Sequence, residues 1–152
     1  MNFTIREIGT VRNARIEAVD DGWDAIPSEI HLSDELPDAC LDGIEAFSHL
    51  EIVYVFHRAL GSAPLLGSEH PRENPAWPRV GIFAQRKKAR PNHLGCTVVR
   101  LLRREGRVLH VARLDAIDGT PVVDIKPVMR EFLPEGAVAQ PAWSSELMRG
   151  YW

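Results

Sequence analysis

Short runs with the alternating pattern of β-strands recur along this chain, without the regular intervening helices that a parallel sheet requires. Antiparallel strands in this number favour a closed or nearly closed barrel. The sequence therefore predicts a mainly β fold: a small antiparallel β-barrel with short helices and a long loop. The expected strands are residues 3–11, 28–32, 48–57, 94–104 and 107–116, with a helix over 37–46 and a Gly- and Pro-rich loop over 60–77.

One block, residues 79–95, joins such a pattern to a turn crowded with positive charge. Alternation from Val80 to Gln85 predicts a short strand that carries Arg86 at its end. Three further cations then lead to a stiff Pro-Asn break: Lys87, Lys88 and Arg90.

A second block, residues 114–127, repeats the arrangement with carboxylates. A strand through Val111 and Asp115 is expected to reach an Asp118-Gly119 turn and to return through Val122 as a hairpin. Asp118 is expected to be structural, because Asp before Gly stabilises turns. Cations and carboxylates at neighbouring strand ends would create a polar site for a ligand that carries charges of both signs.

Three segments of the chain, taken in order, resemble the TsaA-like family, also called YaeB or TrmO. They are FSHLEIVYVFH at residues 47–57, GIFAQR…RPNHLG at 81–95 and LDAIDGTPVVDIKP at 114–127. The family pattern runs roughly FSH…FH, then GVFATR…RPNPIG, then GLD…DGTPVLDIKPY. The resemblance implies an S-adenosylmethionine-dependent methyltransferase, built on a β-barrel, that methylates the adenine nitrogen of threonylcarbamoyladenosine beside the tRNA anticodon. It also implies a homodimer.

The resemblance places the cofactor site at these strand ends. Arg86 matches the last Arg of GVFATR, and its planar guanidinium suits the cofactor's carboxylate; the alternative is a structural ion pair with a carboxylate such as Asp124. Asp115 matches the Asp of GLD. The residues expected to line the cofactor are Trp23, Asp24, Phe56, His57, Arg58, Arg86, Gly95, Cys96, Ala112, Arg113, Leu114 and Asp115.

The loop between the first two expected strands departs from the family pattern. Relatives often carry an Arg and a Gln-Pro-Gly type segment there, whereas this chain has DDGWDAIP at residues 20–27. We expect the indole of Trp23 to stack on adenine and Asp24 to accept a hydrogen bond from an amino or hydroxyl group. Gly95 is expected to let the backbone approach the ligand, because it has no Cβ.

The acceptor nitrogen is a poor nucleophile, so the reaction should benefit from proton removal. Asp115 and His57 are the two candidates for this catalytic role. The expected substrate contacts are Arg90, Asn92, His93 and Lys126, where His93 replaces the family's usual Pro. Two other functions remain open: a methyltransferase acting on a small molecule or another RNA, and an S-adenosylmethionine-binding module without catalysis.

The net charge of the chain is −3, whereas a dedicated tRNA-binding protein usually has a basic surface. The cations are concentrated between residues 72 and 113, which hold eleven Lys or Arg against two Glu. This segment is interpreted either as a phosphate-facing surface or as solvated turn charges. Solvation is favoured for three of the cations, around the Glu105-Gly106 turn: Arg103, Arg104 and Arg107.

The length of 152 residues and the hydrophobic share of 45% are those of one compact domain. We expect a single domain over 1–152, with 128–152 an irregular extension packed on it and a short helix from Ser144 to Met148. No leader pattern or apolar run long enough to cross a bilayer is visible, which predicts a cytoplasmic protein without a membrane partner. Cys40 and Cys96 lack metal-ligand spacing, so free thiols and no metal are expected.

Overall fold

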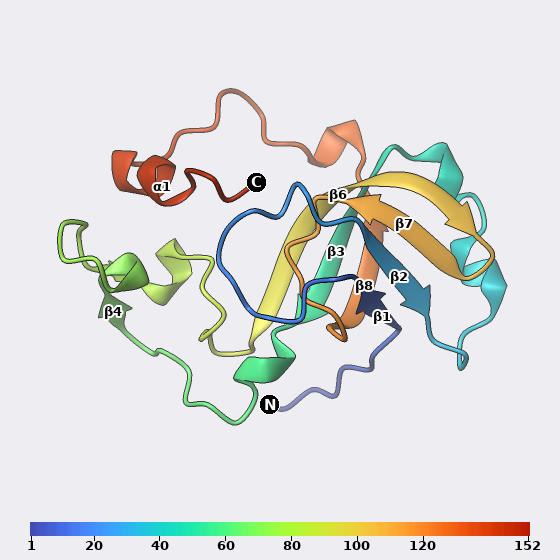
Figure 1. Ribbon diagram of the computed structural model, residues 1–152, viewed down its shortest axis with the longest axis horizontal. Coiled ribbons are helices and arrows are strands. Elements are labelled where there is room, and N and C mark those ends of the chain that lie inside the picture. The colour runs from blue at the N-terminus through green and yellow to red at the C-terminus, as the bar shows by residue number, and fades with distance from the viewer.

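Six antiparallel strands close into a barrel in the computed structural model, which describes residues 1–152 (Figure 1). The order around the barrel is β1-β2-β7-β6-β3-β8, and every neighbouring pair is antiparallel. The mainly β, closed-barrel prediction is therefore confirmed. The barrel strands are β1 (Gly9–Arg12), β2 (Ser28–Leu32), β3 (His49–Val55), β6 (Leu94–Glu105), β7 (Val108–Ala112) and β8 (Pro121–Pro127).

The barrel interior is filled by alternate residues of these strands. In β3, for example, Leu50, Ile52 and Tyr54 point inward and are buried, while the residues between them are partly exposed. Burying each side chain of the size of Leu or Ile stabilises the fold by about 1.5–3 kcal/mol. The core contains Val11, Ile30, Leu32, Leu41, Leu50, Ile52, Tyr54, Val99, Leu109, Val111, Leu114, Ala116 and Val122.

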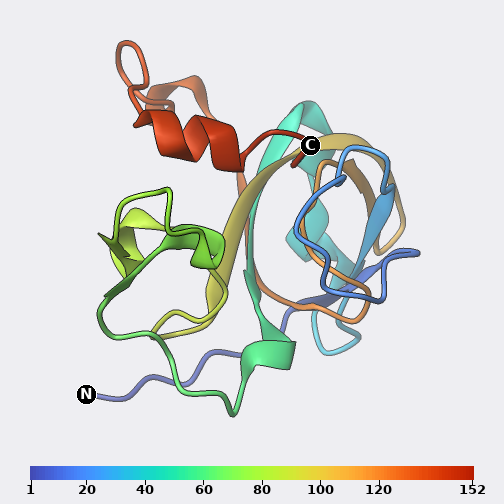
Figure 2. The same cartoon turned by 60° about the vertical axis from the view of Figure 1, so that its left-hand side comes forward.

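A long connection between β3 and β6 leaves the barrel and forms a separate two-stranded sheet of β4 (Ser68–Glu69) and β5 (Val80–Gly81) beside it (Figures 1 and 2). Three short 3₁₀ helices accompany it: η3 (His57–Ala59), η4 (Pro71–Glu73) and η5 (Ile82–Ala84). The strand expected from Val80 to Gln85 is wrong beyond Gly81, because the Gln85 amide donates to the Ile82 carbonyl and closes a 3₁₀ turn. Six residues are too few for alternation alone to separate a strand from a turn.

The expected hairpin between the strand through Val111 and the strand through Val122 is also wrong. Strand β7 ends at Ala112 because Arg113 has a φ of 64°, which a strand residue cannot adopt. The chain then crosses to β8, which pairs with β1 and β3. The Asp118-Gly119 turn is structural as expected, but its partner is the N-terminal segment: Asp118 Oδ1 accepts from the Asn13 amide at 3.2 Å.

Three further elements also differ from the expected ones. Strand β1 begins at Gly9 instead of residue 3. The helix expected over 37–46 is two 3₁₀ helices, η1 (Asp38–Leu41) and η2 (Ile44–Ala46), separated by Gly43 with a φ of 82°. Helix α1 (Ala142–Leu147) begins before Ser144, whose hydroxyl donates to the Pro141 carbonyl.

The C-terminal extension also contains one 3₁₀ helix, η6 (Arg130–Phe132). A hydrogen bond of 2.8 Å from Trp77 Nε1 to Glu146 joins α1 to the connection between β3 and β6. None of the helices has the length and apolarity needed to span a membrane.

Candidate functional site

The carboxylate of Asp115 is the most heavily hydrogen-bonded side chain in the predicted site. Its Oδ1 accepts from the hydroxyls of Tyr54, at 3.0 Å, and of Thr97. Its Oδ2 accepts from the hydroxyl of Tyr151. Strands β3 and β6 supply the first two donors and the C-terminal tail supplies the third, so segments far apart in the sequence fix one carboxylate.

Both phenols in this network stay protonated. Burial, followed by the charge of Asp115, raises the pKa of Tyr54 well above its ordinary value. The same two causes, in the same order, raise the pKa of Tyr151. The two hydroxyls are therefore donors toward Asp115 at any physiological pH.

Sequence reasoning missed Tyr54, Thr97 and Tyr151. For the first two, a signal exists: each places a hydroxyl at an inward position of an otherwise apolar strand, and a buried hydroxyl needs a partner. No comparable signal marks Tyr151, which lies in the irregular C-terminal segment.

The segment that carries Asp115 has unpaired backbone amides. None of the amide groups of residues 113–117 donates a hydrogen bond within the protein. Arg113, whose positive φ turns the chain out of β7, pairs with Asp24 at 2.9 Å. Free backbone amides beside a carboxylate fit a ligand with polar edges such as the adenosine and amino-acid parts of S-adenosylmethionine. The predicted residues Asp24, Ala112, Arg113, Leu114 and Asp115 do come together here.

Arg86 and Cys96 meet through a backbone contact. The exposed guanidinium of Arg86 donates to the Cys96 carbonyl and forms no ion pair, while Asp124, the alternative partner, pairs with Lys126. The Cys96 thiol donates to Glu51 at 2.9 Å. Burial and then this hydrogen bond raise the pKa of the thiol to about 11, so it is unreactive at neutral pH.

Successive side chains of a strand face opposite sides of a sheet. Because Thr97 contacts Asp115, the thiol of Cys96 next to it faces away from the Asp115 network. The sequence analysis predicts that Cys96 lines the cofactor, but its side chain does not line this part of the site. Only its carbonyl is involved, through Arg86.

The indole of Trp23 is not open for stacking in this structure. Its side chain is only 5% exposed, and the guanidinium of Arg15 lies 4.3 Å above the ring. Its Nε1 donates to the Asp20 carbonyl at 3.1 Å. Trp23 is thus a packing residue of its loop, and the adenine stacking expected of it has no free ring face here.

Gly95 is required by packing inside the barrel, which corrects the interpretation that it admits a ligand. Gly95 pairs with Tyr54 across β3 and β6. A Cβ at this position would lie 2.8 Å from the Tyr54 hydroxyl oxygen and closer still to two ring carbons. The space that a side chain would need is already filled by the phenol that bonds Asp115.

His57 and its neighbours lie just after the C-terminal end of β3, which is also the end that carries Tyr54. Burial, and then the charge of Arg58, lowers the pKa of His57, which keeps the imidazole neutral and able to accept a proton. Phe56 packs edge-on against Tyr54, with ring centroids 5.4 Å apart, and Arg58 is exposed. No hydrogen bond joins His57 to the Asp115 network.

The four expected substrate residues do not form one surface. His93 is buried, has a φ of 49° that a proline could not adopt, and bonds the Lys88 carbonyl at 3.1 Å through Nδ1. Arg90 donates to the Gln85 carbonyl at 3.1 Å, so both residues hold the turn together. Asn92 is exposed beside them, and Lys126 lies apart on β8.

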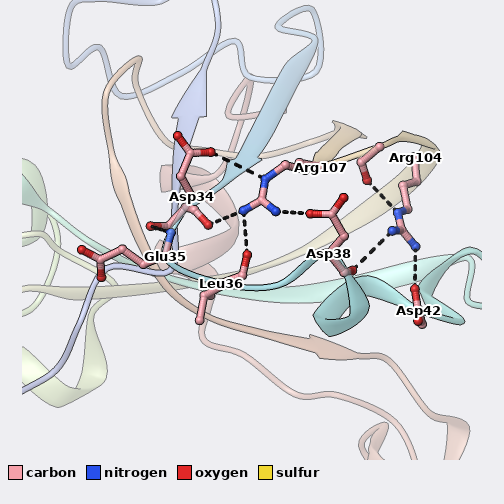
Figure 3. Close-up of polar contacts among 9 residues, drawn as sticks. Asp34, Glu35, Leu36, Asp38, Asp42, Arg104 and Arg107 are labelled. Atoms are coloured by element: carbon pink, nitrogen blue, oxygen red, sulfur yellow. Dashed lines mark hydrogen bonds and ion pairs between the residues drawn. The ribbon is translucent and has the colours of Figure 1, made fainter.

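Arg104 and Arg107 are neither solvated nor open to phosphate, which corrects the expectation for this turn. Arg107 donates to the Leu36 carbonyl at 2.8 Å and to Asp38 (Figure 3). Arg104 donates to the Leu41 carbonyl at 2.9 Å. The two guanidinium groups thereby hold the segment of residues 33–42 against the β6–β7 hairpin. Arg103 remains exposed.

Comparison with known proteins places this barrel in a family. The family model described as the tRNA-methyltransferase O N-terminal domain matches residues 18–132. The chain belongs to this family. The matched residues hold five of the six barrel strands together with Arg86 and Asp115, whereas Tyr151 lies beyond them.

Individual relatives agree with the assignment. A probable S-adenosyl-L-methionine-binding protein of Pyrococcus abyssi is 45% identical over 92 residues, 60% of this chain and 47% of its own. The tRNA (adenine(37)-N6)-methyltransferase of Escherichia coli is 35% identical over 162 residues, 96% of this chain and 68% of its own. The crystal structure of TrmO from Pseudomonas aeruginosa matches with a TM-score of 0.75 and 27% identity, covering 94% of this chain and 62% of that one. The chain thus spans about half to two thirds of the length of these proteins.

Proposed function

We propose that this protein is an S-adenosylmethionine-dependent methyltransferase that methylates N6 of adenine 37 in tRNA. The proposed acceptor is N6-threonylcarbamoyladenosine next to the anticodon. The observation that carries the proposal is the family match over residues 18–132, which includes five of the six barrel strands and the segment bearing Asp115. Relatives named as methyltransferases of adenine 37 and as S-adenosyl-L-methionine-binding proteins support it.

S-adenosylmethionine supplies an activated methyl group: its S–CH₃ bond breaks as the N6–CH₃ bond forms, the electron pair stays on sulfur, and the N6 proton leaves. The protein has to hold donor and acceptor in line and exclude water. In the proposed site, Arg86 binds the cofactor's carboxylate, and the free amides of residues 113–117 bind its adenosine part.

Of the two candidates for proton removal, His57 suits the task better than Asp115. Hydroxyls already occupy three of the roughly four hydrogen-bonding positions of the Asp115 carboxylate. We therefore assign Asp115 to holding a hydroxyl or amino group of the bound cofactor. His57 is neutral at physiological pH, because burial lowers its pKa, and its imidazole can take the acceptor's proton.

The proposal is tested by incubating the protein with methyl-labelled S-adenosylmethionine and tRNA that carries unmethylated threonylcarbamoyladenosine. Label should appear on that nucleoside. Replacing Arg86 with Ala should weaken cofactor binding by about 1.5–3 kcal/mol in calorimetry, since a hydrogen bond between charged groups is removed. Cofactor binding without label transfer to tRNA would instead indicate a binding module or another acceptor.

The ion pairs that basic residues form within the protein favour a second candidate function, methyl transfer to a small molecule. Several of those expected to face phosphate are neutralised within the protein: Arg72 pairs with Asp21, and Lys87 with Glu69. Two cations, Lys88 and Arg100, are exposed and their side chains take part in no ion pair or hydrogen bond. If they bind phosphate, changing both to Glu should reduce the slope of tRNA affinity against salt by about one unit for each phosphate that is no longer neutralised. An unchanged slope would favour the small-molecule acceptor.

We also propose that the protein acts as a homodimer in the cytoplasm. The C-terminal extension exposes several large apolar side chains, of which Phe132 is 84% and Val138 74% exposed, and such surfaces often mark interfaces. Both cysteines are free, as a reducing compartment would keep them. Sedimentation velocity of the purified chain tests the dimer: a species of monomer mass at micromolar concentration would exclude it.

A further inference from the structure

The last residues of the chain, 150–152, lie against the loop of residues 20–24 (Figures 1 and 2). The Gly22 amide donates to the Gly150 carbonyl, and the Trp23 amide donates to the Tyr151 carbonyl, both at 2.9 Å. These backbone bonds fix the tail in one register against the loop. The Tyr151 side chain is thereby held over Asp115.

The two oxygens of Asp115 are not equally supported. Oδ1 has two donors, Tyr54 and Thr97, which both belong to the barrel. Oδ2 has one donor, the Tyr151 hydroxyl. Removal of that hydroxyl would leave Oδ2 without a partner and the carboxylate free to turn about its remaining hydrogen bonds.

The neighbouring tail residue makes a parallel contact. The guanidinium of Arg113 lies 4.5 Å above the ring of Trp152, and the same guanidinium pairs with Asp24. Tyr151 and Trp152 also pack edge to face, with centroids 5.1 Å apart. The tail thus touches two residues of the proposed cofactor site, Asp115 and Arg113, although it lies outside the region that the family model matches.

We propose that Tyr151 is a positioning residue of the methyl-donor site: its hydroxyl fixes the orientation of the Asp115 carboxylate, while Trp152 holds Arg113. The assignment rests on the proposed function, because it takes Asp115 and Arg113 as part of that site. The tail is then a functional wall of the cofactor pocket, beyond its role in packing.

The test compares Tyr151→Phe with the wild type. The change removes only the hydroxyl and should raise both the Kd and the KM for S-adenosylmethionine about tenfold, the equivalent of one weakened hydrogen bond. The KM for tRNA and the melting temperature should remain those of the wild type. A chain lacking residues 151–152 should bind the cofactor at least as weakly as is expected of Tyr151→Phe. This truncation gives a second measurement if Tyr151→Phe is unstable.

The matched control is Trp77→Phe, which removes the hydrogen bond that joins Glu146 of the same C-terminal segment to the connection between β3 and β6. Its cofactor affinity should equal that of the wild type. Equal weakening in Trp77→Phe and Tyr151→Phe would overturn the assignment, because it would reflect general loosening of the segment. So would unchanged affinity in Tyr151→Phe. Failure of the wild type itself to bind S-adenosylmethionine would overturn the proposed function, and this assignment with it.

Discussion

Replacing Gly95 with alanine should destabilise the barrel by about 3 kcal/mol. The added Cβ would lie 2.8 Å from the Tyr54 hydroxyl and closer to two ring carbons, whereas carbon atoms in contact are normally about 3.5–4.0 Å apart. The Tyr54 ring is 2% exposed and is anchored to Asp115, so it cannot swing aside. Overpacking costs typically about 1–3 kcal/mol, and a displacement of this size belongs at the upper end of that range.

Urea unfolding measures this cost, with Gly67→Ala as the matched control. A Cβ at Gly67 meets nothing within 4 Å, and its φ is not in the left-handed region, so that variant should be as stable as the wild type. In a Tyr54→Leu background, where the clashing ring is absent, Gly95→Ala should change the free energy of unfolding by less than about 0.5 kcal/mol. An unchanged midpoint for Gly95→Ala, or the same cost in both backgrounds, would refute the packing account of Gly95.

Three further expectations follow from the hydrogen bonds and pKa values. Tyr54 and Tyr151 keep their protons in the folded state, whereas unfolded tyrosines ionise at about pH 10. Their contribution to the free energy of unfolding should therefore be fully present below that pH and fall above it by about 2.7 kcal/mol per pH unit. Tyrosinate absorbance should appear only on unfolding. Exposed Cys40 should react quickly with a thiol reagent and Cys96, with a pKa of about 11, slowly; equal rates would contradict the burial of Cys96. Arg107→Ala should lower stability by about 1.5–3 kcal/mol in urea unfolding with no change in S-adenosylmethionine affinity by calorimetry.

The barrel could be predicted because alternation of apolar and polar residues within each segment marks its strands. Strand β2 has the bounds that alternation indicated, and β3 and β6 lie within two residues of the expected ones. The pairing of β8 could not be read in the same way. An Asp-Gly turn usually closes a hairpin, but the left-handed Arg113 ends β7 before it, and β8 finds its partners in β1 and β3. A single backbone conformation thus decided the topology around the site.

The candidate site was predictable only in part, for a related reason. Asp115 stands out through its motif, and the structure adds why it is held there: three hydroxyls from β3, β6 and the C-terminal tail converge on it. That convergence depends on strand register and on contacts between distant segments, which local patterns do not encode. The same limit explains Trp23, whose burial under Arg15 follows from the path of the loop rather than from its composition.

The most direct measurement of the central claim is mass spectrometry of nucleosides from bulk tRNA of a strain that lacks the gene. The account predicts that methylated threonylcarbamoyladenosine disappears, that the unmethylated nucleoside accumulates, and that the wild-type gene restores the methyl group. A gene carrying Asp115→Asn should restore much less, because its amide cannot accept all three hydroxyl hydrogen bonds. An unchanged nucleoside profile in the deletion strain would contradict the proposal that this protein methylates adenine 37 of tRNA.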